Sequence, residues 1–307
     1  MGLTLLESAR SEQDLARGAV ISELSEGPLL GIMPFRDVEG AGIFYEQEGE
    51  LPAVGFRGIN ETADQTYGVM NPQSEALKIF TSEVDVDTAL IDFHGPEAKA
   101  NQIRMKVRSM RMTLEDLFIN GNESANPRQF DGLQVRINDN SSQSILQSGG
   151  ALSLQTLDEL SDTVDAAGGQ KVFLMNKTMR RRLTAASRST SIGGFITYSQ
   201  DQFGRRVEQF GDIPIITMDT NAQNQQILPF TESGSTCSIY CVALGDLLTT
   251  MIQGRNRGTF GVSIRELGEV PDAPVDRTRI EWYVGAAIFN GRSAARLRGV
   301  TNAPVVA

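Results

Sequence analysis

The chain has 307 residues, and its 38 acidic and 28 basic side chains give a formal net charge of −10. This length supplies enough apolar residues for one large domain or two smaller ones. The negative charge argues against a protein that grips nucleic acid, because tight binding depends on neutralising phosphates with lysine and arginine. There is no apolar run of the ~20 residues that a membrane span requires, and the two cysteines suit a reducing compartment.

The first 90 residues are predicted to form an arm followed by an extended ribbon. Residues 1–33 contain a short amphipathic helix and then a loop with glycine and proline. Residues 34–90 are acidic and extended, and the side chains of KIFTSEVDVD alternate as in a strand. Glycine and proline between its arms favour a long two-stranded excursion. Two strands alone are marginally stable in water, so another segment or a neighbouring subunit is expected to pack against this ribbon.

Residues 91–129 contain the longest helical signal, EAKANQIRMKVRSMRMTLEDLFI, which is entered through Gly95 and Pro96. At 100° per residue, one apolar stripe falls within about 60° of Ile103. The other members of this stripe are Ala100, Val107, Met110, Leu114 and Leu117. A second stripe lies near the opposite side, and basic residues lie between the two. Glu115 follows the last of these basic residues, Arg111, by four positions and can pair with it.

A helix with two apolar faces is packed between two layers. Either it lies in the middle of one large core, or one face meets its own domain and the other meets a different segment or subunit. The second stripe and the basic flank are therefore candidate contacts with another segment or subunit. They comprise Met105, Met112, Ile119, Arg104, Arg108 and Arg111.

Residues 130–254 mix helices and strands, and residues 255–307 are predicted to be mostly strands with turns. KVFLMN, IPIITMD and CSIYCVALG are strand-like, while LSLQTLDELSDTV and KTMRRRLTAASR are helical. Cys237 and Cys241 lie about 13 Å apart in an extended strand, too far for a disulfide, so buried thiols are expected. Strands and helices do not alternate regularly, which predicts an α+β fold.

Little in the sequence points to catalysis. His94 is the single histidine; it precedes the long helix, where a turn or capping role accounts for it, and no G-x-S-x-G motif accompanies it. One histidine and two distant cysteines cannot build a tetrahedral zinc site, and the glycine-rich phosphate-binding motifs are missing. The basic run 180–182 is expected on a solvated helix surface. We expect no enzyme activity, no cofactor and no metal.

Several stretches, in their order and spacing, carry a resemblance to a known family. They are EDLFINGN followed by FDGL, KVFLMNKTMRRRL, GDIPIITMD, VALGD and AAIFNGRSAARLRGV. With these stretches, the chain resembles the major capsid proteins of tailed bacteriophages with the HK97-type fold over most of its length. The resemblance implies five regions: an N-terminal arm (1–33), an extended E-loop hairpin with entry to the peripheral domain (34–90), a spine helix (91–129), an axial domain (130–254) and C-terminal strands of the peripheral domain (255–307).

The resemblance further implies a structural protein that self-assembles, as hexamers and pentamers, into an icosahedral shell around a double-stranded DNA genome. The expected location is the virion capsid, assembled in the host bacterial cytoplasm. The implied partners are copies of itself, a separate scaffolding protein, a portal and a decoration protein, with packaged DNA contacted weakly and without sequence specificity. Two alternatives stay open: an encapsulin-type nanocompartment shell and, more distantly, a soluble α+β enzyme or small-molecule-binding protein.

Overall fold

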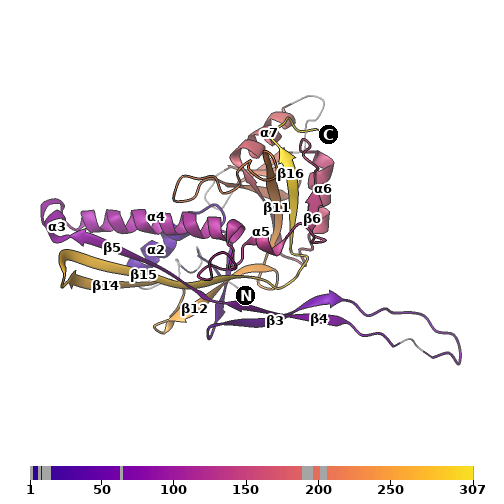
Figure 1. Ribbon diagram of the computed structural model, residues 1–307, viewed down its shortest axis with the longest axis horizontal. Coiled ribbons are helices and arrows are strands. Elements are labelled where there is room, and N and C mark those ends of the chain that lie inside the picture. The colour runs from indigo at the N-terminus through magenta and orange to yellow at the C-terminus, as the bar shows by residue number, and fades with distance from the viewer. Residues whose placement is uncertain are drawn as a thin grey trace.

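The protein is described from a computed structural model that covers residues 3–5, 8, 15–62, 65–188, 196–200 and 206–306. It has an elongated body along which one long helix lies, an upright part at one end of that body, and a two-stranded hairpin that projects away from both (Figure 1). One sheet of 14 strands runs through the body and the upright part, and a separate two-stranded sheet forms the hairpin.

The elongated body is a helix packed on a strongly bent sheet. The helix is α4 (Glu97–Asn120), preceded by the short α3 (Thr88–His94). Its sheet is centred on the 16-residue strand β15 (Ala273–Ile288), which pairs antiparallel with β5 (Lys78–Asp87) and with β14 (Ser263–Val270). Every second residue of β15 from 278 to 284 is buried, which is the alternation of a sheet with one covered face.

The sheet continues from β15 toward the N-terminal strands. β12 (Thr249–Asn256) pairs with the end of β15 and, in parallel, with β2 (Pro34–Val38). β1 (Leu3–Thr4) pairs with β2, and β13 (Thr259–Phe260) pairs with β12. The helix α2 (Leu15–Ser25) packs against α4 and contributes Val20, Ile21 and Leu24 to the core of the body.

The upright part is built around β11 (Thr236–Leu244), which is buried along its whole length. β11 lies between β7 (Gln170–Asn176) and β16 (Ala294–Thr301), antiparallel to both. The sheet extends beyond β7 and β16 through four further strands: β10 (Ile213–Met218), β9 (Arg206–Phe210), β8 (Ile196–Gln200) and β6 (Ser144–Leu146). Three helices complete this region: α5 (Leu133–Arg136), α6 (Leu154–Thr163) and α7 (Lys177–Ser187).

Two hydrophobic cores meet at β11, whose side chains alternate between them. Tyr240 and Val242 belong to the core shared with α4, whereas Ile239 and Cys241 belong to the core covered by α6 and α7. Two of the helices begin at side-chain caps: Ser153 accepts from the backbone N–H of Gln155 at the start of α6, and Asn176 caps α7. Both cysteines are buried and free, as predicted, and burial raises the pKa of each thiol to about 12.

The structure changes the pairing expected for the ribbon and for the last strand. The hairpin is formed by β3 (Gly42–Glu50) and β4 (Val69–Ala76), while KIFTSEVDVD is β5 and pairs with β15. β16 pairs with β11 and β6, so it lies in the upright part and not beside β14. The expected boundary at 254/255 falls inside β12. The pairing of β5 with β15 joins residues about 190 to 205 positions apart, which local alternation cannot reveal.

Candidate assembly surfaces

The apolar stripe of α4 centred on Ile103 faces the core of the body. Val107, Met110 and Leu114 are buried, and Ile103 and Leu117 pack partly against the same core. Ala100, one turn before Ile103, is exposed. The helix is therefore mostly exposed in its first two turns and mostly buried toward its C-terminal end.

The second predicted stripe is not one uniform face. Met105 is 61% exposed, Met112 is half-buried and Ile119 is completely buried. The difference follows position along the helix, because other segments surround only its C-terminal end. Asn120 donates to the backbone carbonyl of Ile227 at 2.8 Å, so the loop after β10 closes over that end. Met105 is left as an exposed apolar side chain on the surface.

The three predicted arginines also differ in their exposure and in their contacts. Arg104 and Arg108 are exposed, and neither forms an ion pair within the described part of the chain. Arg111 is turned toward the N-terminal segment: its Nη1 donates to the carbonyl of Glu23 at 3.0 Å and lies 3.8 Å from Glu26 Oε2. Arg104 borders a groove of about 390 Å³ between α2 and α4, whose apolar lining includes Val20 and Ile103.

Glu115 serves a different partner from the one expected. Its Oε1 accepts from the backbone N–H groups of Leu29 and Leu30 at 3.2 and 3.5 Å, and it forms no short ion pair with Arg111. Burial raises the pKa of Glu115, opposed in part by these two N–H groups and by the charge of Arg111. A Cβ on Gly27 would lie 2.5 Å from Glu115 Oε1. The chain after α2 is thus held against α4 by a buried carboxylate.

The β3–β4 hairpin is the most exposed part of the described chain. Residues 51–62 and 65–70, which include its tip, are exposed throughout, and Phe56 and Ile59 there are large apolar side chains. On β3, alternate residues place Glu46 and Glu48 on one exposed face together with Phe44, which is 87% exposed. Soluble monomers seldom expose apolar side chains so densely, and such surfaces mark interaction sites.

The root of the hairpin is fixed by a group of polar contacts that the sequence did not reveal. Arg136, from α5, donates to both carboxylate oxygens of Glu75 at 2.5 and 2.8 Å. It also donates to the carbonyls of Ala286 at 3.0 Å and Asp131 at 2.8 Å. Tyr45 packs on Phe289 with ring centroids 4.7 Å apart. Arg136 and Glu75 are 61 residues apart, so no local pattern could have paired them.

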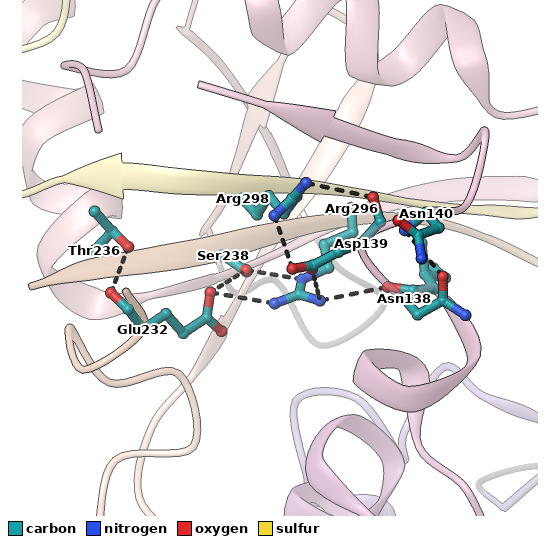
Figure 2. A network of polar contacts seen from close by, with 9 residues as sticks. Asn138, Asp139, Asn140, Glu232, Thr236, Ser238, Arg296 and Arg298 are labelled. Atoms are coloured by element: carbon teal, nitrogen blue, oxygen red, sulfur yellow. Dashed lines mark hydrogen bonds and ion pairs between the residues drawn. The ribbon is translucent and has the colours of Figure 1, made fainter. Parts of the chain in front are cut away.

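Another arginine, which is buried, links separate segments around β11 and β16. Arg296, on β16, donates to Ser238 Oγ at 2.9 Å and lies 3.3 Å from Glu232 and 3.6 Å from Asp139 (Figure 2). Arg298 contacts the other oxygen of Asp139 at 2.8 Å. These side chains come from three separate segments and border a polar cleft of about 520 Å³. The cations and carboxylates balance one another, so the network links segments without leaving a net charge.

The remaining predicted features lie away from these surfaces. His94 is the exposed last residue of α3, immediately before the Gly95 cap. On α7, Arg180 lies 3.6 Å from Glu208 and Arg182 contacts Asn302, at the helix surface. No group of His, Cys, Asp or Glu side chains in the described ranges could hold a metal ion. None of the described helices is long and apolar enough to cross a membrane.

Comparison with known proteins brings these features together. A family model for the SU10 major capsid protein matches residues 57–228, more than half of the chain. The structure is similar to the SrpI encapsulin of Synechococcus elongatus PCC 7942, with 18% identity, a TM-score of 0.65, and 91% of this chain and 89% of that chain covered. No curated protein sequence matches the chain.

Solved capsid structures show the same fold. A chain from the capsid of a native GTA particle shares 14% identity with a TM-score of 0.58, and 91% of each chain is covered. A chain of Mycobacterium phage Cain shares 11% identity with a TM-score of 0.61, covering 90% of this chain and 89% of that one. The predicted α+β fold of the HK97 type is thereby confirmed.

Proposed function

This chain belongs to the SU10 major capsid protein family and is a structural subunit of a phage capsid, and from that premise we propose how it assembles. Copies of the chain contact one another through the β3–β4 hairpin and the exposed flank of α4, and they close into an icosahedral shell of hexamers and pentamers around double-stranded DNA. The shell is part of the virion, and its assembly takes place in the host bacterial cytoplasm.

The observation that carries the assembly proposal is the projecting hairpin. It pairs with no third strand in the described chain, and its tip exposes large apolar side chains to solvent. Two strands in water are marginal by themselves, so a neighbouring copy is the natural surface for it. A contact between two different patches of identical subunits is heterologous, and such contacts build closed assemblies when the rotations close.

The exposed side of α4 is the second proposed contact. Arg104 and Arg108 lie one helical turn apart, about 6 Å along the axis, and no acid in the described ranges pairs with them. Glu46 and Glu48, on the exposed face of β3, are spaced about 6.6 Å apart. Because the hairpin points away from its own α4 (Figure 1), such a pairing would join two copies. Met105 supplies the apolar part of this surface, whereas Met112 is half-buried and Ile119 and Arg111 contact segments of their own chain.

Further partners follow from the same proposal. A separate scaffolding protein would set the curvature of the growing shell, a portal would occupy one vertex, and a decoration protein would bind the finished surface. The net charge of −10 supports weak, sequence-independent contact with packaged DNA, because tight binding would need an excess of basic side chains to neutralise phosphates.

The test is assembly of the unmodified protein and of a charge-reversed variant. Co-expressed with its scaffolding protein, the unmodified chain is expected to give shells visible by negative-stain electron microscopy. Arg104→Glu combined with Arg108→Glu is expected to lower shell yield at least tenfold while circular dichroism stays unchanged. The matched control, Arg104→Lys with Arg108→Lys, retains the charge and should assemble. Normal yield from the charge-reversed variant would refute the α4 contact.

An encapsulin-type shell is the second candidate, favoured by the similarity to the SrpI encapsulin. The contents of purified particles separate the two. Nuclease-protected DNA inside the particles supports the virion, whereas a stoichiometric protein cargo with no DNA supports the nanocompartment. Only monomers or dimers under the co-expression conditions would contradict both, and would reopen the enzyme alternative.

A further inference from the structure

We propose that Arg136 is the positioning residue that fixes the direction in which the β3–β4 hairpin leaves the body. The consequence for shell geometry rests on the proposed function, but the positioning itself is a property of one subunit. The hairpin is a separate two-stranded sheet, so no ladder of backbone hydrogen bonds to the main sheet sets its direction. The chain connection through Leu77 to β5 and the side-chain contacts at its root therefore orient it.

Arg136 lies where three elements meet. Through Glu75 it holds β4, through the carbonyl of Ala286 it holds β15, and through the carbonyl of Asp131 it holds the segment that follows α4. Side-chain exposure is 15% for Arg136 and 16% for Glu75, so both partners are largely removed from solvent. A planar guanidinium has five N–H donors in a fixed fork. The guanidinium can therefore donate to Glu75 and to both backbone carbonyls at once, whereas the single ammonium of a lysine cannot form the same bidentate contact.

Other contacts at the root join β3 and the start of β5 to the rest of the subunit, and Lys78 at the start of β5 pairs with Glu123 at 2.6 Å. Gln47 Nε2 donates to the carbonyl of Ile288, and Tyr45 packs on Phe289 on one face of β3. The N–H of Leu77 donates to the carbonyl of Ala41 at 2.8 Å and closes the base of the hairpin. Tyr45 also donates weakly to Glu75, at 3.4 Å. Among the described residues of β3 and β4 themselves, Glu75 is the one in an ion pair, and its partner Arg136 joins β4 to both β15 and the region after α4.

A small change at the root becomes large at the tip. The nine residues of β3 span about 30 Å when extended, so a rotation of about 10° at the base moves the far end of the strand by about 5 Å. If the hairpin is the contact between neighbouring subunits, a displacement of that size changes the angle between them. Arg136 would then limit the shell to one curvature.

The subunit-level test measures the hairpin's direction by spin-label distances in the unassembled protein. Labels at Glu48→Cys on β3 and Gln102→Cys on α4 report the angle, and the native cysteines stay unlabelled because both are fully buried. The unmodified protein should give one narrow distance distribution. Arg136→Met is expected to broaden it at least twofold, and Arg136→Lys to broaden it partially.

The matched control is Arg277→Met. Arg277 also makes a bidentate contact, to both oxygens of Asp85 at 2.7 Å, but between β15 and β5, away from the hairpin root. This control should leave the distribution unchanged. If Arg136→Met fails to fold by circular dichroism, Arg136→Lys decides the question. An unchanged distribution in whichever variant folds would overturn the assignment.

The assembly-level readout separates this inference from the proposed function. Shells formed by Arg136→Lys are expected to vary in diameter, while shells of the Arg277→Met control stay uniform. Uniform shells from Arg136→Lys would refute the link to curvature. A different outcome would separate the two claims: the unmodified protein never forms shells, yet its distance distribution is narrow and Arg136→Met broadens it. That outcome would refute the proposed function and support the role of Arg136.

Discussion

Glu115 carries a carboxylate into the core of the body, where its oxygen accepts two backbone N–H groups from the segment after α2. Arg136 and Arg296 do the same with opposite charge, each joining three segments that are distant in sequence. Removing one partner of a buried charged contact costs about 3–5 kcal/mol, mostly because the other partner is left unsatisfied. At the residue scale, then, buried polar side chains connect segments that are distant in sequence, in addition to the hydrophobic cores.

The raised pKa of Glu115 has a consequence for stability against pH. In the folded protein this carboxyl keeps its proton to a higher pH than the ordinary value of 4.5. The unfolded chain therefore binds fewer protons between those two pKa values, and the unfolding free energy falls as pH rises through that window. Glu115→Gln retains an oxygen that accepts from both N–H groups but cannot ionise. The unfolding free energy of this variant should therefore not fall through that window.

We therefore expect Glu115→Gln to match the unmodified subunit near pH 4 and to gain in relative stability as pH increases. Urea unfolding of unassembled subunits across this range measures the difference, with the exposed Glu39→Gln as control. Glu115→Ala, which leaves both N–H groups without an acceptor, should instead destabilise by about 1–3 kcal/mol per lost contact. A difference between Glu115→Gln and the unmodified protein that does not change with pH would contradict this account.

At the element scale, α4 shows how one helix divides its surface between folding and recognition. Its C-terminal end is covered by α5 and the loop near Ile227, while its N-terminal half contacts the sheet on one side and stays open on the other. The same helix therefore has positions where truncation creates a cavity and positions where it changes only the surface.

Two truncations on α4 test this division. Leu114→Ala removes a fully buried side chain and should lower the unfolding free energy by about 2–5 kcal/mol. Met105→Ala removes an exposed one and should change it by less than about 0.5 kcal/mol, while still reducing shell yield. Denaturant unfolding and particle yield, measured on both variants, give the comparison. Equal destabilisation by the two would show that Met105 is covered within its own subunit.

For the whole molecule, the notable feature is how little the hairpin contributes to its own subunit. The described residues of the tip are exposed, and the body and upright part each have a complete core without them. A segment that adds little to folding but exposes apolar side chains is a surface for another molecule. A change in the hairpin should therefore abolish assembly of the shell while the subunit still folds.

Replacing residues 51–68 with an Asn-Gly turn between β3 and β4 tests that separation. Asn-Gly suits a two-residue hairpin turn, so the shortened hairpin can still pair. Thermal unfolding of the subunit is expected to shift by only a few degrees, whereas shells should be lost. Shells of normal size from the shortened protein would show that the tip is not an assembly contact.

Much of the fold could be read from local pattern. The helix 97–119 was placed within one residue of α4, and the stretches around KVFLMN, IPIITMD and CSIYCVALG are β7, β10 and β11. The same patterns, with their order along the chain, carried the capsid resemblance. These features depend on periodicity and capping within a few residues, and neighbouring side chains decide them.

The sequence by itself therefore determined the long helix and several strands, the α+β class, the buried thiols and the family. Only the tertiary structure decided which strands form the hairpin, that β16 joins β11, that Ile119 is buried while Met105 is not, and that Glu115, Arg136 and Arg296 are structural contacts. The physical reason is the separation along the chain between the residues that interact. A helix or strand is specified by neighbours three or four residues away, whereas a buried ion pair or a sheet register depends on segments that only the folded chain brings together.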